Sequence, residues 1–281
     1  VAFPPAHVPV EPYLLGLLLG DGHFAGDGVS FCSADEELLY AAERTLPPGT
    51  RFGFKNRVSQ HIVGTQVGVN PLLRILRELG LHGHRAHEKF IPKPYLWNTA
   101  SVRLDVLQGL LDTNGTILRH SNSVSFCTTS AQLAEDVVFL VRSLGGVATQ
   151  RPIAKFFTYR GERRQGRAAW HVTVSLPNSL VPFRLSRKAR LVRAKQPRGQ
   201  PRRFIVGVEA RGEAEAICFK VAHPSGLFVV KDFIVTHNTT GVIMACAALA
   251  EDLRLKGIKG FPLVVAFLRD TYENLKRTTL P

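Results

Sequence analysis

Cysteine is scarce in this sequence, and its placement excludes two kinds of small scaffold. The 281 residues include four cysteines, Cys32, Cys127, Cys218 and Cys246. No two of them form a C-x-x-C pair, which argues against a zinc ribbon and against a disulfide framework. A reducing, intracellular setting is therefore expected. Cys32 and Cys127 fall in predicted strands, where we expect them to be buried apolar residues.

Long hydrophobic runs are also missing. The apolar stretches are shorter than the roughly 20 residues that a membrane-spanning helix needs, or are interrupted by glycine. No signal-peptide pattern is visible at the start. We therefore expect no membrane partner and a cytoplasmic location, in a bacterium or a phage host. The sequence begins with Val1 in the middle of a pattern, which suggests a fragment of a longer protein.

Acidic residues are the third shortage. There are 22 Asp and Glu against 36 Lys and Arg, so the formal net charge is +14. The basic residues are clustered: nine lie in residues 184–203 without any acid, and six lie in residues 151–167 with one glutamate. Clusters of this kind favour contact with a polyanion such as nucleic acid. A simply solvated surface is the alternative.

One motif occurs twice. Residues 14–22 form an apolar, helix-like run that ends in an acid between two glycines, and residues 107–115 repeat the plan with an amide near the end. The same four residues, Val-Ser-Phe-Cys, follow each copy at 29–32 and 124–127. Helical patterns come next in both. Residues 12–100 and 101–195 therefore form a duplicated unit, after a lead-in at 1–11.

Two glycines in the middle of the repeated helices predict close packing. Gly16 and Gly109 each cost about 1 kcal/mol of helix stability relative to alanine, a cost that makes sense if the two backbones touch. The carboxyl ends of the helices would then place Asp21 beside Asn114. Acidic oxygens from two related halves can hold Mg²⁺ at a phosphodiester. The alternative is two ordinary buried helices with glycine C-caps.

The paired motif resembles the LAGLIDADG (dodecapeptide, DOD-type) homing endonucleases, in particular those embedded in inteins. The segments at 89–96 and 129–146 are similar to other conserved segments of that family, and the resemblance covers about residues 1–238. It implies an α+β fold with pseudo-twofold symmetry, two central packed helices and β-sheets that face DNA. It also implies a monomer that hydrolyses double-stranded DNA with Mg²⁺.

The resemblance assigns roles at the helix ends, and one of them is in doubt. Asp21 matches the first metal-binding acid, and the second is expected at position 114, where this sequence has Asn114. An amide oxygen is a much weaker Mg²⁺ ligand, so we expect cleavage to be lost, slowed or limited to one strand. Asp112 is expected to support the helix end. Lys89 matches a lysine proposed to assist the attacking water; a surface lysine is the alternative.

Further residues are expected on the DNA-facing strands and the basic arm. The strands predicted within 51–69, 148–157 and 169–175 carry polar side chains that can read bases or contact phosphates. A basic helix or arm is predicted at 183–194. The candidate DNA contacts are Lys55, Arg57, Gln60, His61, Arg151, Lys155, Arg163, Arg164, Arg187 and Lys188. The histidines His82, His84 and His87 lack the partners of a zinc site, so we do not expect one there.

The segment at 196–238 has a different character. It reads as short strands and ends in Thr236, His237 and Asn238, followed by Thr239. It resembles the C-terminal splicing segment of helicase-type inteins. That resemblance implies that Asn238 cyclises, that His237 protonates the leaving amine and that Thr239 accepts the acyl group. The N-terminal splicing half is missing from this sequence, so splicing by the chain alone is not expected.

Residues 239–281 are expected to belong to the interrupted host protein. They resemble the part of a P-loop ATPase that follows the Walker lysine, and residues 267–276 look like part of a phage large-terminase ATPase. Three hypotheses remain for the chain: an intein-embedded endonuclease, a decayed endonuclease that only binds DNA, and a LAGLIDADG-type transcription regulator. The third is disfavoured by the His-Asn-Thr junction.

Overall fold

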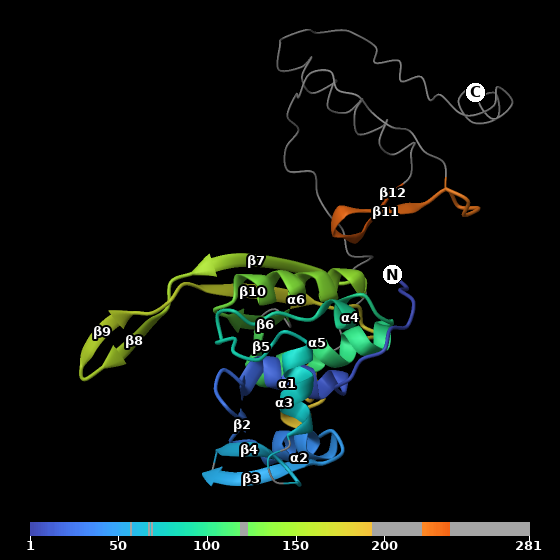
Figure 1. The fold of residues 1–281 in the computed structure, drawn as a ribbon. Helices are drawn as coiled ribbons and strands as arrows, with labels where there is room; N and C mark the ends of the chain where they lie inside the picture. Colours follow the sequence, from blue (N-terminus) through green and yellow to red (C-terminus); the bar gives the residue numbers. More distant parts are fainter. Residues whose placement is uncertain (57, 67, 69, 119–122, 193–220, 237–281) are drawn as a thin grey trace, which may run out of the picture. The chain divides into compact units, whose positions relative to one another are not determined.

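The computed structural model describes residues 1–236 except 57, 67, 69, 119–122 and 193–220. The chain divides into two compact units, Val1–Pro201 and Arg202–Pro281. Figure 1 shows the ribbon. Within the described residues, no helix is long and apolar enough to cross a membrane.

The two halves of the first unit have a similar order of elements, and the second half has two additional strands, β8 and β9. In the first half the elements are α1 (Pro12–Asp21), β1 (Gly22–His23), β2 (Val29–Cys32), α2 (Glu36–Arg44), β3 (Thr50–Asn56), β4 (Ser59–Gly64) and α3 (Pro71–Glu78). The short helix α4 (Lys93–Leu96) connects the halves. The second half has α5 (Ala100–Asn114), β5 (Gly115–Leu118), β6 (Ser123–Thr128), α6 (Ala131–Ser143), β7 (Val147–Ile153), β8 (Phe156–Tyr159), β9 (Glu162–Gln165), β10 (Ala169–Ser175) and α7 (Ser186–Ala189).

The two halves also share a sheet topology. The strand order is β1-β2-β4-β3 in the first sheet and β5-β6-β10-β7 in the second. All neighbouring strands in both are antiparallel. The predicted fold class is therefore confirmed: an α+β fold with a duplicated, pseudo-twofold plan around two packed helices.

Helices α1 and α5 form the centre of the unit (Figure 1). Every residue of α1 from Tyr13 to Leu19 is buried, so this helix has no solvated face. The predicted glycine contact is present. A Cβ atom on Gly16 would lie 2.3 Å from the Val106 carbonyl oxygen and 2.9 Å from the Gly109 Cα atom. The two helix backbones touch at Gly16 and Gly109, the positions where neither helix has a side chain.

The Gly109→Ala substitution is expected to destabilise the unit strongly. Its new Cβ would lie 2.3 Å from the Tyr13 carbonyl oxygen and 2.7 Å from the Leu17 amide nitrogen. Because both neighbours are backbone atoms, the helices must separate, at a cost of about 3 kcal/mol or more. Gly28→Ala is the control, since nothing lies within 4 Å of a Cβ built there. Chemical denaturation measures both; equal stabilities would contradict the close contact.

Each sheet has one face in the core and one open face. Phe31 and Ile62 in the first sheet, and Phe126 and Val172 in the second, are fully buried core residues. Because side chains alternate along a strand, the intervening positions point to the other side. In the ladders these include the opposed pairs Ser30–His61 and His171–Arg151. We call these two polar surfaces the open faces.

Several local predictions need correction. Cys32 is exposed rather than buried, and Cys127 is half-buried, because each follows a core phenylalanine, Phe31 or Phe126, in its strand and so points to the opposite face of the sheet. The strand predicted at 148–157 is two strands: β7 ends at Ile153, and β8 pairs only with β9. The short basic helix or arm predicted at 183–194 contains the four-residue helix α7 within its described part, residues 183–192.

The described part of the second unit is small. It contains the antiparallel strands β11 (Phe228–Val230) and β12 (Ile234–Thr236), joined by a turn at Lys231–Phe233. Asp232 and Phe233 in the turn have positive φ angles of 64° and 58°. The predicted splicing residues His237, Asn238 and Thr239 lie outside the described residues, as does the predicted ATPase segment at 239–281.

Candidate functional site

The carboxyl ends of α1 and α5 lie side by side. A Cβ atom built on Gly20 would lie 2.6 Å from the Thr113 Cβ atom, so the last turns of the two helices are in contact. Asp21 and Asn114 are the next residues along each helix. Both are partly buried. The paired helices therefore bring the two halves of the repeated motif to one place, as the sequence predicts.

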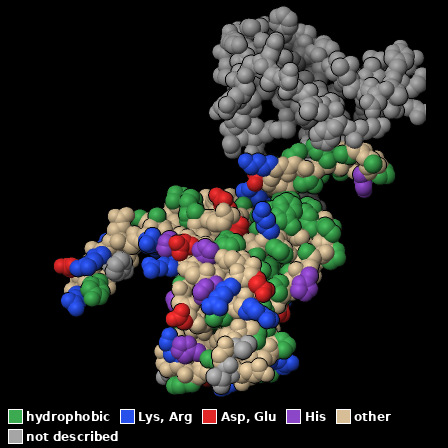
Figure 2. Space-filling model, viewed as in Figure 1, with side chains coloured by type: hydrophobic (Ala, Val, Ile, Leu, Met, Phe, Trp, Pro, Cys, Tyr) green, Lys and Arg blue, Asp and Glu red, His purple; other side chains and the backbone are tan. Residues whose placement is uncertain are grey.

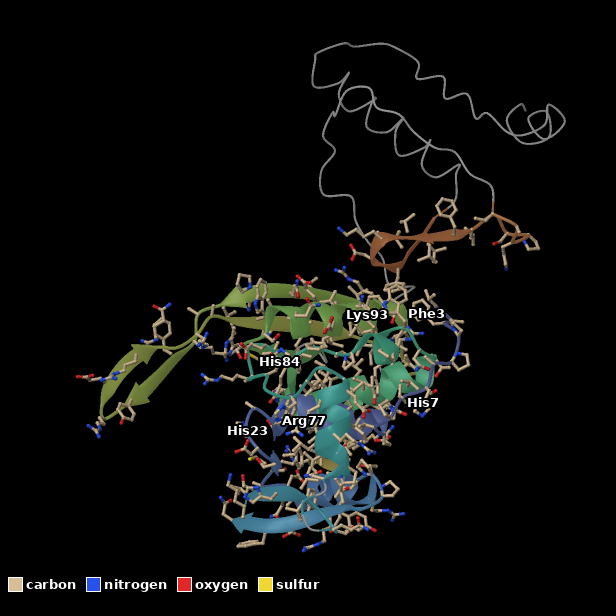
Figure 3. The ribbon with its side chains drawn as sticks, viewed as in Figure 1. Phe3, His7, His23, Arg77, His84 and Lys93 are labelled. Carbon is tan, nitrogen blue, oxygen red and sulfur yellow. The ribbon has the colours of Figure 1, made fainter. Side chains whose placement is uncertain are left out.

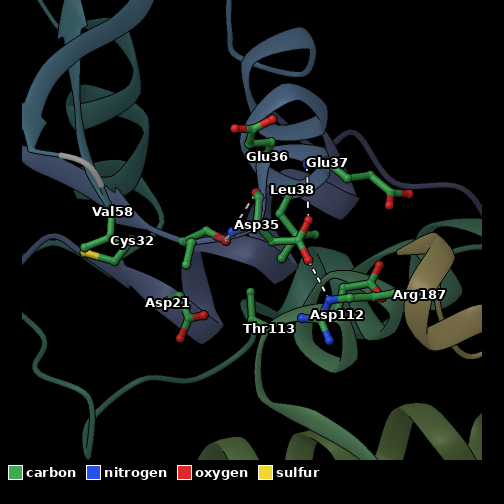
Figure 4. Close-up of a pocket in the computed structure, with 12 residues that line it drawn as sticks. Asp21, Cys32, Asp35, Glu36, Glu37, Leu38, Val58, Asp112, Thr113 and Arg187 are labelled. Atoms are coloured by element: carbon green, nitrogen blue, oxygen red, sulfur yellow. Dashed lines mark hydrogen bonds and ion pairs between the residues drawn. The ribbon is translucent and has the colours of Figure 1, made fainter.

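A cavity of about 790 Å³ opens beside these helix ends. Figure 4 shows Asp21 and Thr113 at one side of it and the start of α2 at the other. The lining is rich in carboxylates and includes Asp21, Cys32, Asp35, Glu36, Glu37, Asp112, Thr113 and Arg187.

The Asp21 carboxylate has the properties of a cation ligand. Burial raises its pKa above the usual range, while the nearby ammonium groups of Lys89 and Lys188 act in the opposite direction. The Asp21 side chain is partly buried and lines the cavity, where its oxygens can meet a hard cation. The described residues contain no cluster of three His, Cys, Asp or Glu that could hold a metal. The Asp21 carboxylate and the Asn114 amide offer two oxygen ligands to a divalent cation, which would need water and a phosphate to complete its shell.

Lys89 is a buried helix cap rather than a surface lysine. Its side-chain nitrogen donates to the carbonyl oxygens of Leu18 at 3.1 Å, Leu19 at 2.9 Å and Gly22 at 2.7 Å. A cation at this end of α1 interacts favourably with the helix dipole. Burial lowers the pKa of Lys89 to about 8, although Asp21 works against that shift.

Lys188 is the counterpart of Lys89 on the other helix. Its nitrogen donates to the carbonyl oxygens of Leu111 at 2.9 Å, Asp112 at 2.6 Å and Gly115 at 2.7 Å. Burial lowers its pKa to about 8 as well. The prediction that Lys188 contacts DNA phosphates is therefore wrong, because its ammonium group is buried against the end of α5.

Each lysine is held in place by the opposite half. The Lys89 carbonyl accepts a hydrogen bond from the Ser130 hydroxyl at 2.6 Å, and Ile91 donates its amide to the Asp136 carboxylate at 2.7 Å. Both contacts fix the first lysine to α6. On the other side, the Ser186 amide donates to Glu37 at 2.9 Å. The two helix caps thereby tie the halves together.

Asp112 supports the end of α5, as predicted. It is 1% exposed and accepts hydrogen bonds from the Tyr13 hydroxyl at 2.9 Å and the Arg184 amide at 3.0 Å. The Leu185 amide is a further donor, at 3.2 Å. Because donors already occupy its oxygens, Asp112 cannot replace Asn114 as a metal ligand in this arrangement.

The Lys89→Met substitution is expected to change how stability depends on pH. The folded pKa of about 8 lies below the ordinary 10.5, so between these values the unfolded chain binds more protons. The free energy of unfolding of the wild-type protein therefore increases as the pH rises across this window. The Lys89→Met variant lacks this increase, which amounts to roughly 3 kcal/mol. Denaturation at pH 7.5 and 10.5 measures it.

The matched control for this pH experiment is Lys93→Met. It removes an exposed lysine four residues farther along the chain, on α4. A wild-type protein and a Lys89→Met variant that respond equally to pH would show that the Lys89 ammonium is not confined at the end of α1.

The structure puts some of the predicted DNA contacts on exposed or open surfaces and others elsewhere. His61 and Arg151 point to the open faces. Lys55 lies at a bulge between β3 and β4. Three further candidates are exposed: Lys155, Arg163 and Arg164. Gln60 needs correction: strand alternation puts it on the same side as Ile62, where its amide donates to the Asn56 carbonyl at 3.4 Å. Arg57 lies outside the described residues.

Arg187 is exposed, and its guanidinium pairs with the Asp35 carboxylate at 2.6 Å. This pair belongs to the rim of the cavity beside the helix ends. A phosphate contact by Arg187 would require it to share or exchange that partner.

His171 is a further candidate site residue, which the sequence did not reveal. Its Nε2 atom lies 2.6 Å from the Ser125 hydroxyl on the open face, and Nδ1 is buried without a partner among the described residues. Burial lowers the pKa of His171, and the neighbouring Arg151 and Lys155 lower it further. The neutral ring can donate or accept, as base recognition requires.

The histidine cluster has structural contacts. His82 Nε2 lies 3.0 Å from the Gly26 carbonyl oxygen, and His84 packs edge-on against Phe90 with ring centres 5.6 Å apart. Figure 3 labels His84 in the segment beyond Arg77.

Comparisons with curated proteins identify two replicative helicases. The chain is 32% identical over 238 residues to the replicative DNA helicase DnaB of Mycobacterium intracellulare, covering 82% of this chain and 35% of the relative. It is 34% identical over 152 residues to the DnaB of Rhodothermus marinus, covering 52% of this chain and 14% of the relative. The chain thus spans about a third or less of these relatives.

Among solved structures, the chain is similar to homing endonuclease I-DmoI in complex with DNA and Ca, with a TM-score of 0.41 and 14% sequence identity. The match covers 64% of this chain and 94% of the I-DmoI chain. For the complex with DNA and Mn, the TM-score is 0.36 at 14% identity, with coverage of 59% and 88%. Residues 101–183 match the family described as LAGLIDADG-like domain. The chain therefore contains a LAGLIDADG-like domain, in the half that carries α5 and Asn114.

Proposed function

We propose that the first unit is the DNA-cleaving domain of an intein-encoded homing endonuclease, and that it cuts mainly one strand of its target. The observation that carries this proposal is the contact between the ends of α1 and α5, where Gly20 meets Thr113. That contact places one acid, Asp21, and one amide, Asn114, at equivalent positions of a duplicated site.

The open faces supply the surface for double-stranded DNA. They carry neutral polar groups and cations, such as His61, His171 and Arg151, at alternate strand positions. Polar side chains on a β-surface can read base edges in the major groove, and the net charge of +14 attracts phosphates. A monomer suffices, because the duplication supplies both halves of the surface.

The difference between the two helix ends predicts unequal cleavage. A divalent cation, Mg²⁺ in our proposal, lowers the pKa of a bound water and offsets charge on the scissile phosphate. Asp21 can hold such a cation through a charged carboxylate, whereas Asn114 offers only an amide oxygen. Lys89 and Lys188 sit at equivalent places and balance the negative ends of the helices. The two strands therefore meet sites that differ chiefly at one residue.

The intein setting follows from the chain's C-terminal sequence and its relatives. The DnaB matches are consistent with an intein inserted in a helicase gene. The sequence from Thr236 to Thr239 provides the residues for cyclisation of Asn238, with residues 196–238 as the splicing segment. Splicing would require the N-terminal half of the intein as a partner. The host ATPase is either helicase-like or terminase-like, and we propose an intracellular location without membrane contact.

A second candidate function is a decayed endonuclease that binds DNA without cutting it. Asn114 favours this candidate, because an amide stands where the second of two metal-binding carboxylates is expected. In that role the domain would retain its open faces and support folding of the splicing segment.

One pair of assays separates the two candidates. The probe is a duplex of the host coding sequence with the intein coding sequence removed. We expect the protein to bind it in Ca²⁺ and to cut it in Mg²⁺. Binding without cutting would support the second candidate, and failure to bind would overturn both. Mass spectrometry of the purified chain separately tests cleavage between Asn238 and Thr239.

A further inference from the structure

A row of polar side chains distinguishes α5 from α1. Its members are Asp105, Gln108 and Asp112. Their spacing of three and then four residues puts them on one face of the helix. The equivalent positions of α1 are Pro12, Leu15 and Leu19. Because buried polar groups are costly without hydrogen-bond partners, the polar row requires matching groups. They come from residues 181–188, which follow β10 and include the start of α7; we call this segment the strap.

One residue of the strap, Arg184, contacts all three members of the polar row. Its Nε atom donates to the Gln108 Oε1 atom at 2.7 Å, and its guanidinium group pairs with the Asp105 carboxylate. Its backbone amide donates to the Asp112 carboxylate at 3.0 Å. The Gln108 amide group in turn donates to the Val181 carbonyl oxygen at 2.7 Å. The strap thus satisfies Gln108 and Asp112, which are 8% and 1% exposed.

The Arg184 side chain is directed at α5 although it is 40% exposed. Its guanidinium carbon lies 4.4 Å from the centre of the Tyr13 ring. A planar guanidinium group can bind two acceptors and stack on a ring at the same time, which an ammonium group cannot do. Figure 2 shows many Lys and Arg side chains on the visible surface of the first unit. Arg184 differs from a freely solvated cation, because two of its side-chain nitrogens bind the central helix.

A single helical turn joins Arg184 to Lys188. The Lys188 amide donates to the Leu185 carbonyl oxygen at 3.0 Å, so the turn begins directly after Arg184. Lys188 is 8% exposed, and its ammonium group caps the end of α5. A shift of Arg184 along α5 would therefore move Lys188 away from the carbonyl oxygens that it caps.

Apolar burial also holds the strap, but it acts differently. Phe183 and Leu185 are 2% and 1% exposed and belong to the core. Because the hydrophobic effect is not directional, these two side chains can keep the strap against the unit without fixing its position along α5. Hydrogen bonds have defined directions and lengths. The contacts of Arg184 can therefore set the position of the strap along the helix.

We infer that Arg184 is a positioning residue for the proposed cleavage: it fixes the strap along α5 and thereby places Lys188 at the carboxyl end of that helix. This inference rests on the proposed function and adds a residue to its site. The first half uses a different arrangement, because Lys89 is held through the Ser130 hydroxyl of the α6 N-cap. Loss of the Arg184 contacts should therefore affect one of the two buried lysines and leave the other in place.

The first measurement is acetylation of lysine amines in the folded chain, followed by mass spectrometry. The test variant is Arg184→Gln. We expect Lys188 to be acetylated at least about 10-fold faster in this variant than in the wild-type protein, because bonds of a charged group are lost and the strap opens more often. Acetylation of Lys89 should not change. The exposed Lys93 should react rapidly in both proteins.

Two further variants make this measurement specific. Arg74→Gln is the matched control, because it removes the same charge and breaks an exposed pair with Glu78 on α3. It should leave Lys188 protected. Asp105→Asn removes one acceptor of Arg184 and keeps the arginine itself, so it should raise the acetylation of Lys188 by a smaller factor. Thermal melting establishes which variants are folded, and Asp105→Asn carries the test if Arg184→Gln is not.

The second measurement is cleavage of the intein-less host duplex in Mg²⁺ at saturating protein, with DNA binding in Ca²⁺ measured in parallel. We expect Arg184→Gln to cut about 10-fold more slowly. Its Kd and the slope of log Kd against log salt should remain those of the wild-type protein, because Arg184 binds α5 and not phosphate. Arg74→Gln should cut at the wild-type rate.

Three results would overturn the inference. They are equal acetylation of Lys188 in the wild-type protein and in Arg184→Gln, a faster acetylation without any change in cleavage rate, and a reduced salt slope, which would make Arg184 a phosphate contact. A wild-type protein that does not cut the duplex would instead overturn the proposed function. Acetylation does not depend on cleavage, so it would still decide whether Arg184 fixes Lys188.

Discussion

The Asn114→Asp substitution is expected to convert the proposed nicking activity into cleavage of both strands. The new carboxylate would occupy the position on α5 equivalent to Asp21 on α1, beside the same kind of buried lysine. Since a carboxylate binds Mg²⁺ far better than an amide, cleavage of the slow strand should rise at least 100-fold, about 2.7 kcal/mol of transition-state stabilisation. A supercoiled plasmid with the target site measures it, through the ratio of linear to open-circular product.

The control for this gain is Asn178→Asp, which adds the same negative charge at an exposed position outside the helix ends. It should leave the product ratio unchanged. If Asn114→Asp also leaves the ratio unchanged while the protein stays folded and bound to DNA, then position 114 does not hold a metal.

The Asp21→Asn substitution is expected to abolish the remaining cleavage. It would leave both helix ends with neutral amides, so that no carboxylate remains to hold a cation at the junction of α1 and α5. The rate should fall about 1,000-fold or more, equivalent to roughly 4 kcal/mol. DNA binding in Ca²⁺ should persist, because the substitution leaves the open faces and strands β8 and β9 unchanged.

Asp27→Asn is the matched control for this loss. Asp27 is exposed between β1 and β2, in the same half as Asp21, and its removal changes the charge equally. Cleavage by Asp21→Asn at the wild-type rate would show that Asp21 is not a ligand in the reaction. A loss of DNA binding in this variant would instead point to a folding defect.

The sequence predicted the centre of the fold because that centre depends on local signals. The duplicated motif and the glycines at 16 and 109 predicted two touching helices, and the structure shows their backbones in contact. The helical pattern that follows the second copy of the motif forms α6, Ala131–Ser143. In each case periodicity, glycine and capping residues agree with the tertiary structure.

What the sequence did not predict depends on long-range contacts. Lys188 is part of a run of basic residues and resembled a phosphate contact, yet it caps α5. Only its spacing from Asn114, similar to that of Lys89 from Asp21, carried a signal. His171 gains its partner Ser125 from a strand 46 residues away. The break between β7 and β8 follows from the sheet edge, where pairing with β10 ends.

The most direct test of unequal helix ends is strand-resolved cleavage by the wild-type protein. Each strand of the intein-less host duplex is labelled in turn, and the rate of cutting in Mg²⁺ is measured. We expect one strand to be cut at least about 100-fold faster than the other, because only Asp21 offers a carboxylate. Equal rates for the two strands would contradict the assignment of Asp21 and Asn114, and no cutting of either strand would favour a domain that only binds DNA.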